Sequence, residues 1–152
     1  MVEGAEEQIH LELVTPDRVM VRESVLAVSL PGRNGYLGVL PGHAPLLTEL
    51  KPGELSYTQA PQPGVTHYLC VNWGFAEVLH HRVIVLVATS ERPEEIDVER
   101  ARKARQRAEE RLRRAGAGDA EIDALRAQAA LERAMARLEV AQHASHEAGV
   151  EP

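Results

Sequence analysis

The chain has 152 residues, a hydrophobic fraction of 44% and a formal net charge of −6 at pH 7. This length suits one ordinary domain or two small ones, and the negative charge argues against a general nucleic-acid binder. The single cysteine, Cys70, excludes an internal disulfide framework and fits a reducing compartment. The longest apolar run, Val83 to Ala88, is far shorter than the roughly 20 residues of a membrane helix. Neither a signal nor a transit peptide is expected, because the first residues are neither basic nor apolar.

Residues 9–89 have the pattern of short β-strands. Ile9, Leu11 and Leu13 alternate with their neighbours, as in a strand with one buried face. Eight of the nine prolines lie between Pro16 and Pro93, and together with glycines they separate the apolar runs. Short strands at this spacing predict a sandwich or a barrel. The expected strands cover residues 9–14, 19–21, 25–30, 36–40, 46–49, 54–57, 66–71, 74–79 and 82–88.

After Pro93 the composition changes to Ala, Arg, Glu and Leu, and apolar residues recur at steps of three and four. This spacing predicts two amphipathic helices, which the short link between them makes antiparallel neighbours. We expect Gly116 to end the first helix in a left-handed conformation and Asp119 to cap the second. The predicted fold class is therefore α+β, with a β-domain over residues 1–90 and a helical hairpin over residues 91–152. The apolar stripes are residues 101, 104, 108, 112 and 115, and residues 124, 127, 131, 134, 138 and 141.

The stripes of this hairpin are mostly alanine. Burying one CH₂ group contributes about 0.8 kcal/mol, and alanine offers little beyond its methyl group. We therefore expect the hairpin to dock weakly, as a moving part would. The many arginines of the first helix allow two interpretations: a solvated face with i,i+4 ion pairs, or a cationic face for an acidic partner or a phosphate ligand.

No catalytic constellation is visible in the sequence. There is no P-loop and no nucleophile elbow, and Cys70 lies in an apolar strand, where an inert core thiol is the simpler interpretation. His143 and His146, with Glu139 and Glu147 nearby, could form a metal site, but an exposed helix end explains them better. We therefore predict no catalytic residues, no metal site and no enzymatic activity of the chain by itself.

The hexapeptide that starts at Ile96 opens the first predicted helix, and a near-copy starts at Ile122. Helix capping explains both copies: the acidic residue favours a helix start, Ile seals the entry and Ala lines the seam. The repetition favours this explanation. Taken alone, the hexapeptide is weak evidence of a binding site.

Several longer stretches resemble the epsilon subunit of bacterial rotary ATP synthases. The resemblance covers nearly the whole chain, and its most specific part is the loop at residues 38–48, Gly-Val-Leu-Pro-Gly-His-Ala-Pro-Leu-Leu-Thr. The other matching stretches are Val14-Thr15-Pro16, residues 50–53, residues 73–78 and residues 130–138, with Trp73 in place of a family glycine.

The resemblance implies a sandwich of about ten strands followed by a regulatory hairpin. It also implies a non-catalytic role in the central stalk, where the subunit couples rotation to ATP synthesis and its extended hairpin inhibits hydrolysis. The expected partners are the gamma subunit, through His43, the loops of the c-ring, and the alpha/beta catalytic head. The expected location is peripheral, on the cytoplasmic side of the cell membrane. The turn facing the c-ring would be Asn34, Gly35, Tyr36 and Leu37, with Tyr36 in place of a frequent family glutamate.

In some members of the family the folded hairpin binds ATP through the motif Ile/Leu-Asp-x-x-Arg-Ala. Here Ile96, Asp97, Arg100 and Ala101 match that motif, and Glu91 occupies the position of a further family contact. An antiparallel pair of helices could aim four guanidinium groups at one polyphosphate, and Arg is suited to this by its fixed fork of donors. No cofactor is required, and ATP is a possible regulatory ligand, with capping and solvent exposure as the alternative. The further arginines are Arg107, one helical repeat after Arg100, and Arg133 and Arg137 on the second helix. A stand-alone nucleotide-sensing or adaptor module is the alternative function.

Overall fold

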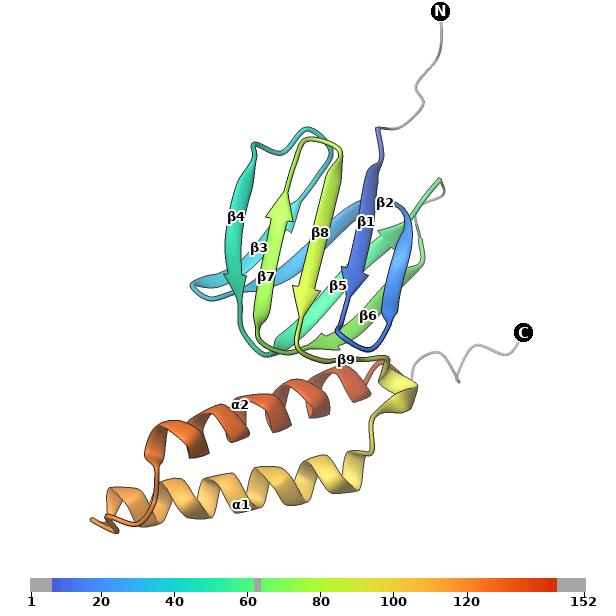
Figure 1. The fold of residues 1–152 in the computed structure, drawn as a ribbon. Helices are drawn as coiled ribbons and strands as arrows, with labels where there is room; N and C mark the ends of the chain where they lie inside the picture. Colours follow the sequence, from blue (N-terminus) through green and yellow to red (C-terminus); the bar gives the residue numbers. More distant parts are fainter. Residues whose placement is uncertain (1–6, 62–63, 145–152) are drawn as a thin grey trace, which may run out of the picture. The chain divides into compact units, whose positions relative to one another are not determined.

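The computed structural model describes residues 7–61 and 64–144, and the chain divides into two compact units, Met1–Ser90 and Glu91–Pro152. The first unit is a two-layered β-structure and the second is a pair of helices (Figure 1). Among the described residues, no helix has both the length and the apolar character needed to cross a membrane.

The β-unit folds its strands into two layers (Figure 1). The strand order is β1-β8-β7-β4-β2-β5-β6-β9, and β3 pairs with β2. β1 lies parallel to β8 and antiparallel to β2, so β2 connects the layers: its first half pairs with β1 and its second half with β5 and β3. The strands are β1 (Ile9–Val14), β2 (Val19–Gly32), β3 (Gly35–Val39), β4 (Leu46–Leu50), β5 (Gly53–Gln59), β6 (Thr66–Val71), β7 (Gly74–Val78), β8 (Arg82–Val87) and β9 (Ser90–Glu91).

The strand β2 joins two runs that the sequence pattern separates. Residues 19–21 and 25–30 belong to one strand of 14 residues, with a register shift against β5 between Val25 and Ala27. No Gly or Pro interrupts the polar stretch between the two runs, and Arg22 and Glu23 pair with β1 without a break. The described residues thus form nine strands, where about ten were expected.

The core of the β-unit consists mainly of branched aliphatic side chains. The alternation in β1 is confirmed, because Ile9, Leu11 and Leu13 are buried while His10 is exposed. Fully burying one such side chain contributes about 1.5–3 kcal/mol. The largest fully buried side chains are Ile9, Leu11, Leu13, Leu30, Leu50, Leu55, Val25, Val39, Val71, Val78, Val83 and Val85.

The helical unit starts with a short 3-10 helix, η1 (Pro93–Glu95), followed by α1 (Val98–Gly116) and α2 (Ala124–Ala141). The two long helices form the expected antiparallel pair (Figure 1). Small side chains form the seam, and the buried ones include Ala101, Ala108, Ala127 and Ala134. Short seam side chains let the two backbones approach closely and contribute little buried area.

The link between the helices differs from the expectation in two respects. Gly118, with φ of 94°, adopts the left-handed conformation that was predicted for Gly116, and Gly116 is instead the last residue of α1. Asp119 does not cap α2: its carboxylate accepts a hydrogen bond from the backbone N–H of Glu121 at 3.1 Å, which stabilises the turn before the helix. Asp123 is the cap, because it directly precedes the helix and accepts from the backbone N–H of Arg126.

Candidate functional site

A hollow of about 460 Å³ lies within the helical unit, between α1 and α2. We call it the hairpin cleft. Small seam residues form its floor, arginines from both helices flank it, and carboxylates lie at the end where η1 meets α1. Its lining residues are Glu91, Glu95, Asp97, Arg100, Ala101, Ala104, Arg107, Ala130, Arg133, Ala134 and Arg137.

The cap of α1 sets the geometry of one wall. Asp97 has an extended backbone, and its side chain accepts a hydrogen bond from the N–H of Arg100 at 3.0 Å, which fixes where the helix begins. Arg100 is three residues after Asp97, and Arg107 is seven residues after Arg100. A spacing of seven residues is about two helical turns, so both arginines lie on the same helix face. On α2, Arg133 and Arg137 are four residues apart and share a face in the same way.

One arginine of the cleft already has a carboxylate partner. The Nε of Arg137 donates to a Glu91 oxygen at 2.6 Å, and about 30% of the Arg137 side chain is exposed. A guanidinium has five N–H donors, so this pair leaves further donors of Arg137 available to a ligand. Glu91 therefore holds the Arg137 guanidinium at the lining of the cleft without using up its hydrogen-bonding capacity.

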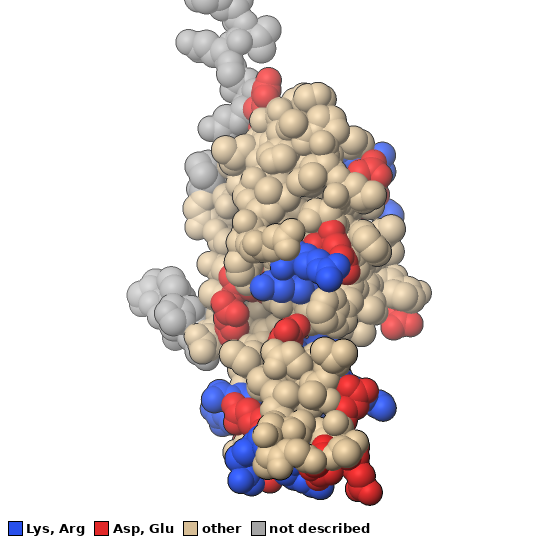
Figure 2. Space-filling model, turned by 90° about the vertical axis from the view of Figure 1, so that its left-hand side faces the viewer, with Lys and Arg blue, Asp and Glu red and all other residues tan. Residues whose placement is uncertain are grey.

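The other three cleft arginines, Arg100, Arg107 and Arg133, form no ion pair within the described part of the chain. Four other arginines of α1 are paired with neighbouring carboxylates, in the pairs Arg102–Glu99, Arg105–Glu109, Arg113–Glu110 and Arg114–Asp119. Both signs of charge accordingly gather over the hairpin in Figure 2. The expected solvated ion-pair face exists, and it is separate from the unpaired cations of the cleft.

A second hollow of the helical unit shows the contrast. It has a volume of about 540 Å³ and is lined by Arg102 and Arg105, among other residues. Both arginines already bind a glutamate, Arg105 at 2.8 Å. A larger hollow with neutralised cations is a poorer anion site than the cleft, because a ligand there must displace internal carboxylates.

Seven of the eight residues predicted to bind ATP line the hairpin cleft. The exception is Ile96, which is 7% exposed and does not line it. Sequence reasoning missed Glu95 and three alanines of the lining. Glu95 could have been found from its position two residues before the capping Asp97. Those alanines are Ala104, Ala130 and Ala134, which the apolar periodicity marks as seam residues.

The two loops that the resemblance assigns to partners lie at separate places in the β-unit. His43, in the loop between β3 and β4, is half-buried, and its Nδ1 lies 2.7 Å from the Ala44 carbonyl oxygen. That loop contacts the β7–β8 turn, because the N–H of Gly42 donates to the His80 carbonyl at 2.6 Å.

The predicted c-ring turn joins β2 to β3, and Asn34, Gly35 and Tyr36 are exposed there while Leu37 is half-buried. The Tyr36 hydroxyl accepts a hydrogen bond from the backbone N–H of Glu54 at 3.3 Å, so the ring lies along β5.

Cys70 is buried in β6. Across residues 7–61 and 64–144 no group of His, Cys, Asp and Glu could hold a metal ion. The histidine pair considered as a metal site includes His146, which lies outside the described residues together with Glu147.

Two family models match this chain in succession. Residues 8–93 match the β-sandwich domain of the ATP synthase delta/epsilon chain, and residues 94–142 match its long α-helix domain. The chain belongs to the delta/epsilon family of ATP synthase subunits, and its resemblance to the epsilon subunit is confirmed.

Individual relatives agree with this assignment. The ATP synthase epsilon chain of Koribacter versatilis is 55% identical over 105 residues, 69% of this chain and 72% of that protein. The epsilon chain of Nitratidesulfovibrio vulgaris is 47% identical over 135 residues, 89% of this chain and 96% of that protein. Among solved structures, a chain of the Euglena gracilis mitochondrial ATP synthase, in a complex of OSCP, F1 and c-ring, aligns with a TM-score of 0.76 and 28% identity. That alignment covers 94% of this chain and 86% of the other.

Proposed function

We propose that the chain is a non-catalytic regulatory subunit of the ATP synthase central stalk, and that its hairpin binds ATP in the cleft. Membership of the delta/epsilon family supports the first part. The observation that carries the second part is the convergence of four arginines from two helices on one hollow, three of them without a carboxylate partner within the described residues.

The arrangement of charge suggests how the nucleotide lies. Arginine forms charge-assisted, often bidentate hydrogen bonds to phosphate oxygens, so the triphosphate lies along Arg100, Arg107 and Arg133. Ionised carboxylates only accept hydrogen bonds, which suits the adenine amino group and the ribose hydroxyls. Glu91 and Asp97 line the cleft at the end where η1 meets α1, so we place the adenine and the ribose there. A hollow of about 460 Å³ is within the usual range for small-molecule sites.

Because the arginines come from both helices, ATP stabilises the paired form of the hairpin over any form in which α1 and α2 separate. A ligand shifts an equilibrium only by its differential affinity. To move the hairpin from about 1:99 to about 99:1, ATP must prefer the paired form by about 10⁴-fold, or roughly 5.5 kcal/mol. The alanine seam suits this switch, since it leaves little internal packing for the extended form to lose.

We assign the partners by relation to the family. The loop with His43 contacts the gamma subunit, and the turn from Asn34 to Leu37 contacts the loops of the c-ring. In the extended form, the exposed arginines of α1 meet the alpha/beta catalytic head and inhibit ATP hydrolysis. The subunit is then peripheral to the cytoplasmic side of the membrane, and it couples rotation to ATP synthesis. The Euglena neighbour comes from a complex whose name includes F1 and the c-ring, which agrees with these assignments.

Titration calorimetry of ATP into the whole chain tests the cleft. We expect Arg133→Ala and Arg137→Ala each to weaken ATP binding by about tenfold or more, since a hydrogen bond to a charged group contributes about 1.5–3 kcal/mol. Arg102→Ala is the matched control, because it removes the same charge from a paired arginine outside the cleft. Unchanged affinity in both cleft variants, with the control also unchanged, contradicts ATP binding in the cleft.

A reconstitution experiment tests the assembly role. The purified chain should bind a gamma subunit and lower ATP hydrolysis by the alpha/beta/gamma core. A chain that binds ATP but neither binds gamma nor affects hydrolysis would instead be a stand-alone nucleotide sensor.

A further inference from the structure

The two helices of the hairpin carry an internal repeat with an offset of 26 residues, longer than the hexapeptide at Ile96 and Ile122. The identical positions fall on the seam and on its flanks, while the outward faces differ. The repeat therefore preserves the residues at which the helices face each other. The identical pairs are Glu95/Glu121, Ile96/Ile122, Asp97/Asp123, Arg100/Arg126, Ala101/Ala127, Ala104/Ala130, Arg107/Arg133, Ala108/Ala134, Arg111/Arg137, Leu112/Leu138 and Ala115/Ala141.

The two copies also have the same local structure. Asp97 and Asp123 cap their helices with nearly identical backbone angles, φ −79° and ψ 98° against φ −78° and ψ 101°. Each accepts a hydrogen bond at 3.0 Å from the N–H of the arginine three residues later. The alanine that follows each arginine is 3% exposed in both copies. Because the helices are antiparallel, the two copies lie at opposite ends of the hairpin.

A hollow exists at each end. The end near the α1–α2 link has a hollow of about 400 Å³, lined by Arg111, Glu121, Ile122, Asp123, Arg126 and Ala127. We call it the tip hollow. In the hairpin cleft, Arg100 of the capped motif faces the hollow together with Arg137 of the other helix. Their counterparts in the repeat, Arg126 and Arg111, line the tip hollow in the same way with the helices exchanged.

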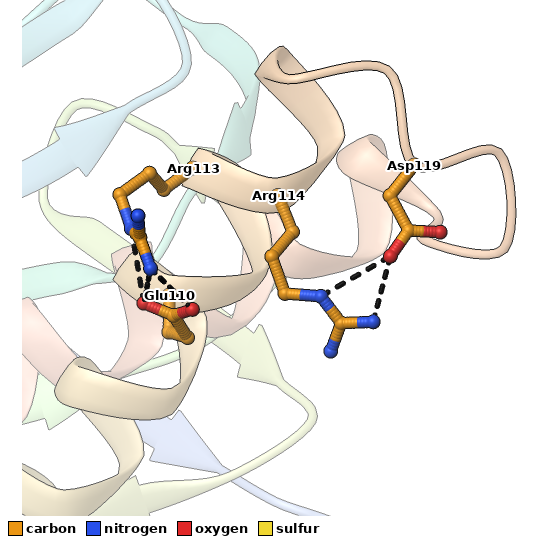
Figure 3. A network of polar contacts seen from close by, with 4 residues as sticks. All are labelled: Glu110, Arg113, Arg114 and Asp119. Carbon is orange, nitrogen blue, oxygen red and sulfur yellow. Dashed lines mark hydrogen bonds and ion pairs between the residues drawn. The ribbon is translucent and has the colours of Figure 1, made fainter.

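The two arginines of the tip hollow form no ion pair within the described ranges, 7–61 and 64–144. Two arginines that follow Arg111 on α1 are neutralised: Arg113 binds Glu110 and Arg114 binds Asp119, both at 2.6 Å (Figure 3). Two carboxylates also line the tip hollow: Glu121, and Asp123, which accepts the backbone N–H of Arg126 as the cap of α2. An anion would therefore bind between the guanidinium groups of Arg111 and Arg126, which have no carboxylate partner in the described ranges.

We propose that the tip hollow is a second anion site, which binds a phosphate group through Arg111 and Arg126 without selecting a base. The ligand class rests on the proposed function of the hairpin cleft, since the repeat transfers it from one end to the other. The lack of base selectivity follows from a difference between the ends: the position of Glu91 in the repeat is Ala117, so the tip has no counterpart of the Glu91–Arg137 pair.

Inorganic tripolyphosphate, titrated into the whole chain and followed by amide NMR, tests the proposal. We expect separate shift changes at Asp97 and Arg100 and at Asp123 and Arg126. At the tip, ATP and tripolyphosphate should bind equally within about threefold. The double variant Arg111→Ala/Arg126→Ala should weaken the tip event by about tenfold or more and leave the cleft event unchanged. Arg113→Ala is a control at the same end that removes one positive charge, against two in the double variant, and it should leave both events within about twofold.

The two proposals can fail independently. Shift changes at the tip with none at the cleft contradict the nucleotide site and support the tip site. Changes at the cleft with none at the tip up to millimolar tripolyphosphate overturn the tip site alone. Equal loss of tip binding in Arg113→Ala and in the double variant also overturns the tip site. The anion would then be attracted by the overall positive charge of this end and not by the two arginines of the hollow. Persistence of the tip event in the double variant overturns it too.

Discussion

The two units of this chain bury very different side chains. The sandwich encloses Leu, Ile and Val that are fully buried, such as Leu11, Leu55 and Val85. The hairpin seam encloses alanine methyl groups, such as those of Ala101 and Ala134. Buried apolar area is the main source of folding free energy. The sandwich therefore has a self-sufficient core, while a ligand that binds both helices can contribute a large share of the stability of the hairpin.

The difference also separates the places where mutations act. A substitution in the sandwich should change global unfolding, for which Trp73, the single tryptophan, is a local probe. A substitution in the hairpin should change local helix opening and ligand binding.

The largest effect is expected for Leu11→Ala in the middle of β1. The side chain is 0% exposed, and truncating a buried leucine costs about 2–5 kcal/mol of the free energy of unfolding. Chemical denaturation followed by Trp73 fluorescence measures this loss. Leu47→Ala is the control in the same unit, because Leu47 is 69% exposed and its truncation should cost little. Equal losses in the two variants would contradict the described core.

Gly74→Ala at the start of β7 should come next. A Cβ there would overlap the Leu86 carbonyl oxygen and lie 2.7 Å from the Cα of Val87, so β7 and β8 would have to separate. Overpacking of this kind costs about 1–3 kcal/mol, and thermal unfolding measures it. Gly38→Ala is the matched control, because a Cβ there meets no atom within 4 Å.

In the hairpin, Asp97→Ala should have a smaller and more local effect. Loss of an N-cap costs about 0.5–2 kcal/mol, here as easier opening of the first turn of α1. Amide hydrogen exchange without nucleotide measures it, and the Trp73 transition should not move. Asp97→Asn retains an oxygen that can cap, so it should keep most of the protection. A shift of the Trp73 transition as large as that of Leu11→Ala would show that the units do not differ as described.

The smallest effect concerns acid. The Arg113 guanidinium holds the pKa of Glu110 below its usual range, and Arg114, with the backbone N–H of Glu121, does the same for Asp119. A lowered carboxyl pKa in the folded state adds stability above the unfolded pKa, and this is lost as pH falls through the folded pKa. Glu110 is exposed and Asp119 is half-buried, and neither lies in a core, so the loss should be small and confined to the hairpin.

Carbon-13 NMR titration of the carboxyl groups checks these two pKa values. Arg113→Ala should raise the pKa of Glu110 toward its ordinary value. Arg111→Ala should leave it in place, because Arg111 does not contact Glu110. A Glu110 pKa that is unchanged in Arg113→Ala would contradict the ion pair seen in Figure 3.

Local rules were sufficient for much of the fold. The alternation of Ile9, Leu11 and Leu13 predicted a half-buried strand, and the three- and four-residue spacing of alanines predicted the helix pair. The same local rules failed where one element continues into or connects to the next. Val19–Gly32 is one strand because pairing with β1 continues through its polar middle, and pairing between distant segments leaves no local signal. Asp119 and Asp123 are both plausible caps by composition, and only the path of the link decides between them.

Periodicity, capping and side-chain chemistry are local properties, so the class of each unit and the residue types that could bind a phosphate were predictable from the sequence. The set of arginines that line the cleft was not, because it depends on how the two helices pack. Arg100 and Arg102 are two residues apart, yet one lines the cleft without a carboxylate partner in the described chain and the other binds Glu99. The Glu99–Arg102 pair is an i,i+3 contact within α1, whereas the cleft exists only where faces of both helices meet, and that is settled when the two helices pack.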